Sequence, residues 1–231
     1  MAERGACWTI WGSDPKVRSA LTRSRASLKA IHPELDQCVV EVADFGPARS
    51  LLQRSAELLR SPFETTLFLD ADTVVLGSLD LAFQQAERFG IAAAVNECPW
   101  AQRYAGIEGE LVEWNCGVLC YTREAAPLLQ RWAELAEELD SSCVHLAASG
   151  LATMEANDQC SFAAAVEDTG IVPFPLPVNF NFRHQWQRGH YGEVKVWHAY
   201  EAPFPSVLEA RDYYAKPGSF IQWHPLSTPK E

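Results

Sequence analysis

The stretch Thr65-Thr66-Leu67-Phe68-Leu69-Asp70-Ala71-Asp72 decides the fold class, because an apolar run ends there in two carboxylates that are two residues apart. The apolar residues 67–69 are predicted to form a strand that is buried on both faces, as in a parallel sheet covered by helices. Side chains alternate along a strand, so Asp70 and Asp72 share a face and can converge on one point. That point lies beyond the carboxyl end of the strand, where open α/β sheets bind their ligands.

Paired carboxylates at this position indicate a divalent metal site. Mg²⁺ and Mn²⁺ prefer hard oxygen ligands, and protein carboxylates commonly share these ions with the phosphate oxygens of a substrate. In the alternative interpretation, Asp70 caps a following helix and Asp72 is solvated. The buried strand before the pair and the turn after it, at residues 76–80, favour the metal site.

Strand-like and helix-like patterns alternate as far as residue 95. Ser13-Asp14-Pro15 provides a cap and a proline suited to the first turn of a helix. This alternation is typical of a doubly wound, mostly parallel α/β sheet. The predicted strands cover residues 7–11, 39–42, 67–69 and 91–95, and the predicted helices follow Pro15 and cover 47–60 and 79–89.

The remainder of the chain is less regular. Loops are predicted at residues 98–113 and 174–186, which lack a clear period, and a further connection at 141–150. Because no linker interrupts the chain, we predict a single domain over residues 1–231. Strands are predicted at 118–121, 170–174 and 194–198, and helices at 128–139 and 157–166, before a proline- and aromatic-rich tail.

Composition excludes several classes of protein. With 19 basic and 30 acidic residues the formal charge is -11, which argues against nucleic acid or an anionic membrane surface as a partner. No run approaches the about 18 apolar residues of a membrane-spanning helix, and no signal peptide is recognisable. The 7 cysteines form no C-x-x-C pair and indicate reduced thiols. These features predict a soluble cytoplasmic protein.

Basic residues are concentrated in one early segment, although the chain as a whole is acidic. The spacing of this group predicts the solvated face of a helix. Its members are Lys16, Arg18, Arg23, Arg25 and Lys29.

The motifs together resemble a known family. Residues 61–73 are similar to the metal-binding D-x-D segment of nucleotide-diphospho-sugar transferases with the type A glycosyltransferase fold, in particular glycosyltransferase family 8, the group of glycogenin and the lipopolysaccharide galactosyltransferases. Further segments resemble that family in the same order, and the resemblance spans roughly residues 7–200. They are Asn115-Cys116-Gly117-Val118, Asn157-Asp158-Gln159, Leu176-Pro177-Val178-Asn179-Phe180-Asn181 and Val196-Trp197-His198.

The resemblance implies a metal-dependent hexosyltransferase-like enzyme that transfers a sugar from a nucleotide-diphosphate donor, expected to be a UDP-sugar, with retention of configuration. The acceptor (a glycan, a protein or a small molecule) is not implied. Mn²⁺ or Mg²⁺ would be held by Asp70, Asp72 and His198. Residues 1–95 would form the nucleotide- and metal-binding half and 96–231 the sugar and acceptor half. The donor would be bound by Thr9, Trp11, Gly12, Arg54, Asp70, Ala71 and Asp72, and the catalytic residues would be Asn115, Asp158 and Gln159.

The chain departs from the family after His198. There the family has a glycine and then Lys-Pro-Trp, whose lysine holds the donor diphosphate, whereas this chain continues Ala199-Tyr200-Glu201-Ala202-Pro203-Phe204. Either another cation meets the phosphates or the activity differs. Lys195 and Lys216 are nearby candidates.

Arg54 is a second basic candidate, on the helix before the D-x-D strand, where the family also has a basic residue. On a helical wheel it falls beside Leu58, at the border of the apolar arc and outside the polar stripe. A guanidinium at such a border should have a fixed anionic partner, which is either a phosphate of the donor or an acidic neighbour.

Other interpretations remain open at this stage. A nucleotidyltransferase also pairs a carboxylate-bound metal with a nucleotide, but it usually has a glycine-rich loop after its first strand, and residues 11–15 contain one glycine. A non-catalytic sugar-nucleotide or glycan-binding protein would explain the missing Lys-Pro-Trp segment. Asp158 could equally be an N-terminal helix cap.

Overall fold

The structure is a computed structural model that describes residues 3–97, 111–147 and 150–226. Most of the loop predicted at 98–113 therefore lies outside the described residues. The strands are β1 Arg4–Ile10, β2 Asp36–Glu41, β3 Thr65–Leu69, β4 Thr73–Val75, β5 Ile91–Val95, β6 Trp114–Thr122, β7 Cys143–Ala147, β8 Gly150–Met154, β9 Phe174–Leu176, β10 Gly189–Tyr191, β11 Val196–His198 and β12 Trp223–Pro225. The α-helices are α1 Pro15–Ile31, α2 Pro47–Leu58, α3 Asp80–Phe89, α4 Ala126–Glu138, α5 Asp158–Thr169 and α6 Pro205–Tyr214, and the short 3₁₀ helices are η2 Arg123–Ala125 and η3 Val178–Asn181.

A central sheet of six strands organises the chain in the order β2-β1-β3-β6-β5-β9. β1 pairs in parallel with β2 and β3, and β5 pairs in parallel with β9. β6 runs antiparallel to both of its neighbours. The predicted doubly wound, mostly parallel α/β architecture is confirmed.

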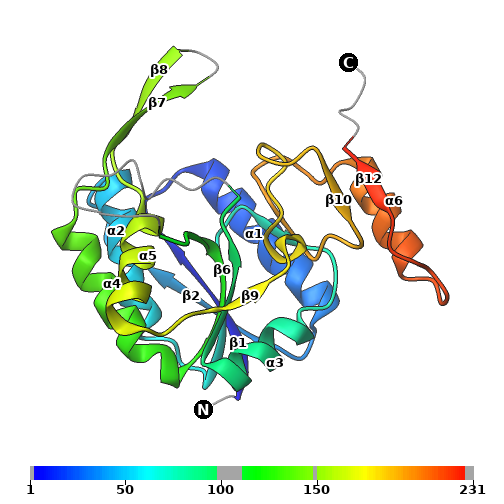
Figure 1. Cartoon of the computed structure of the whole chain (residues 1–231), viewed down its shortest axis with the longest axis horizontal. Coiled ribbons are helices and arrows are strands. Elements are labelled where there is room, and N and C mark those ends of the chain that lie inside the picture. Colours follow the sequence, from blue (N-terminus) through cyan, green and yellow to red (C-terminus); the bar gives the residue numbers. More distant parts are fainter. Residues whose placement is uncertain (1–2, 98–110, 148–149, 227–231) are drawn as a thin grey trace.

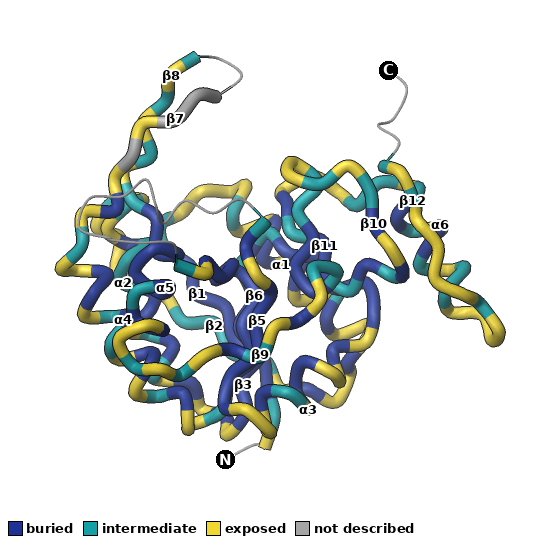
Figure 2. The backbone as a smooth tube through the Cα atoms, in the orientation of Figure 1, coloured by how far each residue is buried: buried dark blue, intermediate teal, exposed yellow. Residues whose placement is uncertain are grey.

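Helices cover both faces of this sheet, and β3 shows why its sequence is apolar throughout. Leu67 and Leu69 belong to the buried cluster that includes side chains of α1 and α3. Phe68 belongs to the opposite cluster, which includes side chains of α2, α4 and α5. Figures 1 and 2 show these two helical layers with the buried sheet between them. Because β3 is covered on both sides, its end is fixed in position, and Asp70 follows it directly.

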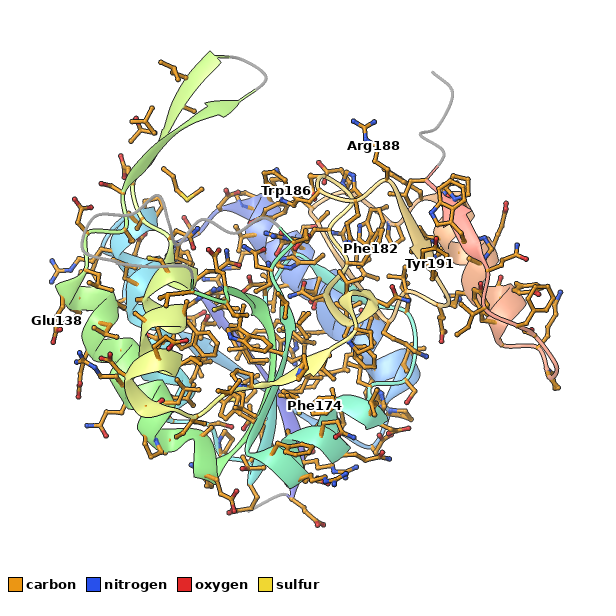
Figure 3. All side chains as sticks on the ribbon, viewed as in Figure 1. Glu138, Phe174, Phe182, Trp186, Arg188 and Tyr191 are labelled. Carbon is orange, nitrogen blue, oxygen red and sulfur yellow. The ribbon has the colours of Figure 1, made fainter. Side chains whose placement is uncertain are left out.

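The C-terminal part of the chain forms a third buried cluster beside the sheet. β11 pairs antiparallel with β4, and this pairing sets His198 opposite Thr73. Phe182, which Figure 3 labels, packs in this cluster with Trp197 and with Val207 of α6. The pairing of β11 with β4 places His198 next to the D-x-D turn.

Several predicted elements need correction. Residues 141–150 were expected to be a connection, but β7 and β8 form a hairpin that projects from the rest of the chain in Figure 1. The strand expected at 170–174 lies at β9 instead, and the loop expected at 174–186 contains β9 and η3. The tail contains α6 and β12. These short elements lack strong periodicity, and tertiary pairing defines them.

Two further findings concern the cysteines and the possibility of a membrane-spanning helix. The cysteines whose side chains are described, at positions 7, 38, 116, 120 and 160, are free thiols. Within the described ranges, no helix combines the length and the apolar character that crossing a bilayer requires.

Candidate metal and nucleotide site

Three potential metal ligands meet at the carboxyl end of β3. Asp70 and Asp72 come from the turn between β3 and β4, and His198 comes from the end of β11. His198 Nε2 lies 3.6 Å from Asp70 Oδ2 and 3.3 Å from Asp72 Oδ1. One donor atom of each residue lies within 4.8 Å of the others, and this is the one such group of three among the residues that the structure describes. Asp70 is followed by β4, and the next helix, α3, has Leu79 at its N-cap, so the capping interpretation is wrong.

The orientation of His198 suits a metal ligand. Its Nδ1 lies 2.7 Å from Asn181 Oδ1, and an amide oxygen only accepts, so Nδ1 carries the proton there. Asn181 is held in turn, because its Nδ2 donates to Asn115 Oδ1 at 2.7 Å. This directs Nε2 at the two carboxylates, where it can hold a proton or, once neutral, offer its lone pair to a cation. In metal sites, the histidine nitrogen that does not bind the metal typically donates a hydrogen bond to a neighbour, and this bond fixes the tautomer.

Gly117 makes room for this group. A Cβ on Gly117 would lie 2.2 Å from His198 Cε1 and 2.7 Å from Asp70 Oδ2, which is closer than real Cβ atoms approach. Its backbone N–H donates to Asn115 Oδ1 at 3.0 Å, and its carbonyl accepts from the N–H of Asp70 at 2.8 Å. The glycine in the Asn115-Cys116-Gly117-Val118 motif therefore has a steric explanation: any side chain would collide with two of the candidate metal ligands.

The charges of this group are mutually dependent. Burial lowers the pKa of His198, but the neighbouring carboxylates of Asp72 and Asp70 outweigh burial and raise it above its usual value. Burial opposes ionisation of Asp72, but His198 nevertheless lowers the pKa of that carboxyl. The metal-free site therefore favours a proton on His198, and a cation must displace it.

Arg54 joins the metal group to the next carboxylate. Its side chain is buried, Nη1 lies 2.5 Å from Asp70 Oδ1, and Nε donates to Asp158 Oδ2. Burial would lower the pKa of the guanidinium, but Asp158 and Asp70 raise it, so Arg54 is permanently charged. The sequence left two anionic partners open for Arg54, a phosphate of the donor or an acidic neighbour. The structure shows the acidic neighbours Asp70 and Asp158.

A cavity of about 290 Å³ opens beside these side chains. Arg54 and the metal group provide most of its polar lining, and most of the remaining lining residues are apolar or aromatic. Gly12 does not line it, but its positive φ of 63° turns the chain after β1, and its carbonyl accepts from Arg18 Nη2. The lining residues are Thr9, Ile10, Trp11, Val17, Leu51, Arg54, Asp70, Ala71, Asp72, His198 and Tyr200.

The three predicted catalytic residues lie beside this cavity rather than in its lining. Asn115, Asp158 and Gln159 are buried and hydrogen-bonded within the protein. Asp158 is not the cap of α5, because Asn157 is, and its side chain accepts from the backbone N–H of Gln159. The capping interpretation of Asp158 is therefore wrong.

Sequence reasoning missed two residues of the site. Glu113 is buried before β6, and its Oε1 accepts from Gln159 Nε2 at 3.1 Å and from Asn96 Nδ2 at 2.6 Å. Asn181 orients His198, and its place in the Leu176–Asn181 motif was the available signal. Glu113 carried no signal, since a single glutamate before a strand is normally solvated.

Neither proposed replacement for the family's lysine lines the cavity. Lys195 forms an ion pair with Glu193, and Lys216 follows α6 and is exposed. Tyr200 lines the cavity instead, in the segment after His198.

No protein-family model and no curated protein sequence matches this chain. Among solved structures, it is similar to mouse xyloside xylosyltransferase 1 in its apo form, with a TM-score of 0.54 and 14% identity over 87% of this chain and 100% of that one. Galactosyltransferase LgtC in complex with donor and acceptor sugar analogues has a TM-score of 0.54 and 14% identity over 87% of this chain and 88% of that one. A glycosyltransferase involved in glycosylation of the major capsid of PBCV-1 has a TM-score of 0.56 and 11% identity over 93% of this chain and 100% of that one. The chain has the type A glycosyltransferase fold.

Proposed function

We propose that this protein is a divalent-metal-dependent glycosyltransferase that moves a sugar from a UDP-sugar to an acceptor, with retention of the anomeric configuration. The observation that carries the proposal is the group of Asp70, Asp72 and His198 in the lining of the cavity. The fold that surrounds it is shared with the glycosyltransferases named above.

The donor set fits Mn²⁺ or Mg²⁺. Two carboxylates and one oriented imidazole leave several coordination positions for phosphate oxygens and water, and Mn²⁺ accepts a nitrogen ligand more readily than Mg²⁺ does. When bound, the metal would stabilise the charge that develops on the departing nucleotide diphosphate. Holding this ion is the role we assign to Asp70, Asp72 and His198.

The apolar and aromatic part of the cavity lining suits a nucleoside. Thr9 and Trp11 line the cavity at the carboxyl end of β1, which is the edge of the sheet where ligands bind in this class of fold. Ala71, between the two carboxylates, leaves space that a larger side chain would occupy. We assign Thr9, Trp11, Gly12 and Ala71 to the nucleoside end of the donor.

The buried residues beside the cavity would position the transferred sugar. Asp158 is ion-paired with Arg54, which makes its carboxylate a poor nucleophile and a suitable orienting group. Retention would then proceed by attack of the acceptor on the same face from which the leaving group departs, with a phosphate oxygen accepting the proton. Gln159 and Asn115, whose amides are already oriented by neighbours, would hold sugar hydroxyl groups.

Binding and turnover measurements test this proposal separately. Isothermal titration of UDP with and without Mn²⁺ should give binding only with the metal, and a panel of UDP-sugars should show metal-dependent release of UDP. Asp36→Asn, an exposed carboxylate at the amino end of β2, is the matched control for substitutions in the metal group. NMR of the product would check retention, because an inverted centre contradicts front-face attack.

Two outcomes would replace the proposal. Metal-dependent UDP binding without sugar release for any donor or acceptor would favour a non-catalytic nucleotide-sugar binder. Release of pyrophosphate from a nucleoside triphosphate would instead identify a nucleotidyltransferase. Absence of metal-dependent nucleotide binding would contradict all three functions.

A further inference from the structure

The candidate donor site has a shortage of positive charge. Arg54 is the permanently charged cation among the residues that line the cavity, and it is committed to Asp70 and Asp158. Asp72 adds a further carboxylate. A nucleoside diphosphate brings several negative charges, so one divalent metal leaves the occupied site with an excess of negative charge.

One more cation lies at the rim of the cavity. Lys16 is in the first turn of α1, directly before the lining residue Val17. Its Nζ lies 4.3 Å from the centroid of the Tyr200 ring, and Tyr200 lines the cavity. The ammonium group is therefore placed beside the segment that follows His198.

Tyr200 is a fixed platform for this ammonium group. Arg23 Nη2 donates to the carbonyl oxygens of Ala199 at 3.2 Å and of Tyr200 at 2.8 Å. The N–H of Ala199 donates to the carbonyl of Asp72 at 3.0 Å, which ties the same segment to the D-x-D turn. Burial raises the pKa of Tyr200 to about 12, and the nearby charges of Asp72 and Asp70 add to the shift. The ring lines the same cavity as the metal group.

Lys16 differs from the other members of the basic segment in having no hydrogen-bonded or ion-paired partner, although its charge acts on Glu201 at longer range. Its ammonium group makes no hydrogen bond or ion pair within the part of the chain that the structure describes. Each of the others donates to a protein oxygen: Arg18 to Glu41 and the Gly12 carbonyl, Arg23 to the Ala199 and Tyr200 carbonyls, Arg25 to Gln37, and Lys29 to the Pro33 carbonyl.

We propose that Lys16 binds the diphosphate of the nucleotide donor, moving from the Tyr200 ring to a phosphate oxygen when the donor enters. This inference rests on the proposed function and deepens it. A contact between an exposed ammonium and an aromatic ring is weak, and a lysine side chain has a flexible stem, so the exchange is easy. Lys16 would supply from α1 the charge that the late segment lacks.

Affinity for UDP and for uridine tests this directly in the presence of Mn²⁺. Lys16→Gln should weaken UDP binding about tenfold, the loss of one exposed charge-assisted hydrogen bond, and leave uridine binding unchanged. Lys16→Arg should recover most of the UDP affinity, since it restores the charge. Lys29→Gln, in the last turn of the same helix, is the matched control and should bind UDP as wild type does.

The outcomes separate this inference from the function on which it rests. Wild-type protein that binds no UDP with Mn²⁺ overturns the proposed function and the role of Lys16 together. Wild-type binding that Lys16→Gln leaves within twofold overturns the role of Lys16 alone. An equal loss for uridine and UDP also overturns it, because the side chain would then act on the nucleoside. Thermal unfolding of each variant verifies that the fold is intact.

Discussion

In the proposed function, Asp70, Asp72 and His198 form a metal wall, and Asp158 and Gln159, behind the cavity lining, form a sugar wall. The two walls differ in how far the protein satisfies their polar groups. On the metal wall, the side chains of Asp70 and Asp72 remain 23% and 20% exposed, and they face the cavity together with His198. On the sugar wall, Asp158 and Gln159 are buried, and their side chains are bound by Arg54 and Glu113. The first wall is open to a ligand, whereas the second is held by the fold.

This difference predicts different consequences of substitution. A side chain whose partners are all in the protein contributes to stability, and its loss leaves buried groups unpaired. A side chain whose donor atoms face a cavity contributes mainly to binding. Arg54 contacts both walls, through Asp70 on one and Asp158 on the other.

Arg54→Ala should have the largest effect, and it should be an effect on stability. The substitution leaves two carboxylates close together without their cation, and breaking a buried pair in this way typically costs about 3–5 kcal/mol. Denaturant unfolding of the metal-free protein measures it. Arg18→Ala removes an exposed pair with Glu41 and should cost less than about 1 kcal/mol.

A second variant distinguishes charge from packing at this position. Arg54→Ala combined with Asp158→Asn should recover part of the lost stability, because one of the two unpaired charges is then gone. If the double variant is as unstable as the sum of the two single variants, the two walls are not joined by this ion pair.

Asp72→Asn should have the next largest effect, mainly on binding. The amide retains the shape but offers a neutral oxygen, so Mn²⁺-dependent UDP affinity should fall by about 100-fold or more, while the thermal unfolding temperature changes little. Asp36→Asn should leave both quantities unchanged. Undiminished Mn²⁺-dependent binding in Asp72→Asn would show that the open wall is not a metal site.

Asn181→Leu tests whether metal binding depends on the hydrogen bond between Asn181 and His198. Without the amide oxygen, His198 Nδ1 loses its acceptor, and the imidazole can adopt other orientations. Loss of such a supporting hydrogen bond usually lowers metal affinity by about 10–100-fold. Mn²⁺ titration of the protein without nucleotide measures the change, and an unaltered affinity would mean that packing alone orients His198.

The metal wall could be predicted from the sequence more completely than the sugar wall, for a physical reason. Asp70 and Asp72 are local, since a buried strand fixes both their spacing and their place at the sheet edge. His198 was placed by its position at the end of a predicted late strand and by the resemblance, because the β4–β11 pairing that brings it there spans most of the chain. The contact of Glu113 with Gln159 joins the segment before β6 to the start of α5 and leaves no local pattern.

The elements of the fold also differ in how well the sequence predicts them. The layers around β1, β3 and β5 follow from strongly periodic segments, and their prediction is confirmed. The β7–β8 hairpin and α6 were missed, because their sequences are short and weakly patterned. Arg54 is an intermediate case: its place beside Leu58 predicted a fixed anion, but the choice between a phosphate and a carboxylate depended on where Asp158 folds.

The smallest expected effect is the pH dependence of the metal wall. His198 must be neutral to bind a cation, whereas Asp72 and Asp70 hold its pKa above the usual value of about 6.5. In the metal-free protein the proton on His198 is stabilising, so that contribution is present below about pH 6.5 and is lost as the pH rises through the raised pKa. For metal binding the sign is opposite: Mn²⁺ affinity should increase with pH up to the raised pKa and then level off. Below the raised pKa, affinity should fall by no more than about tenfold per pH unit, since one proton is displaced.

Mn²⁺ titrations between pH 5.5 and 8 would measure this, and His198→Ala should bind more weakly throughout and lose this part of the pH dependence. A wild-type affinity that does not change over this range would remove His198 from the metal wall and leave Asp70 and Asp72 as its ligands.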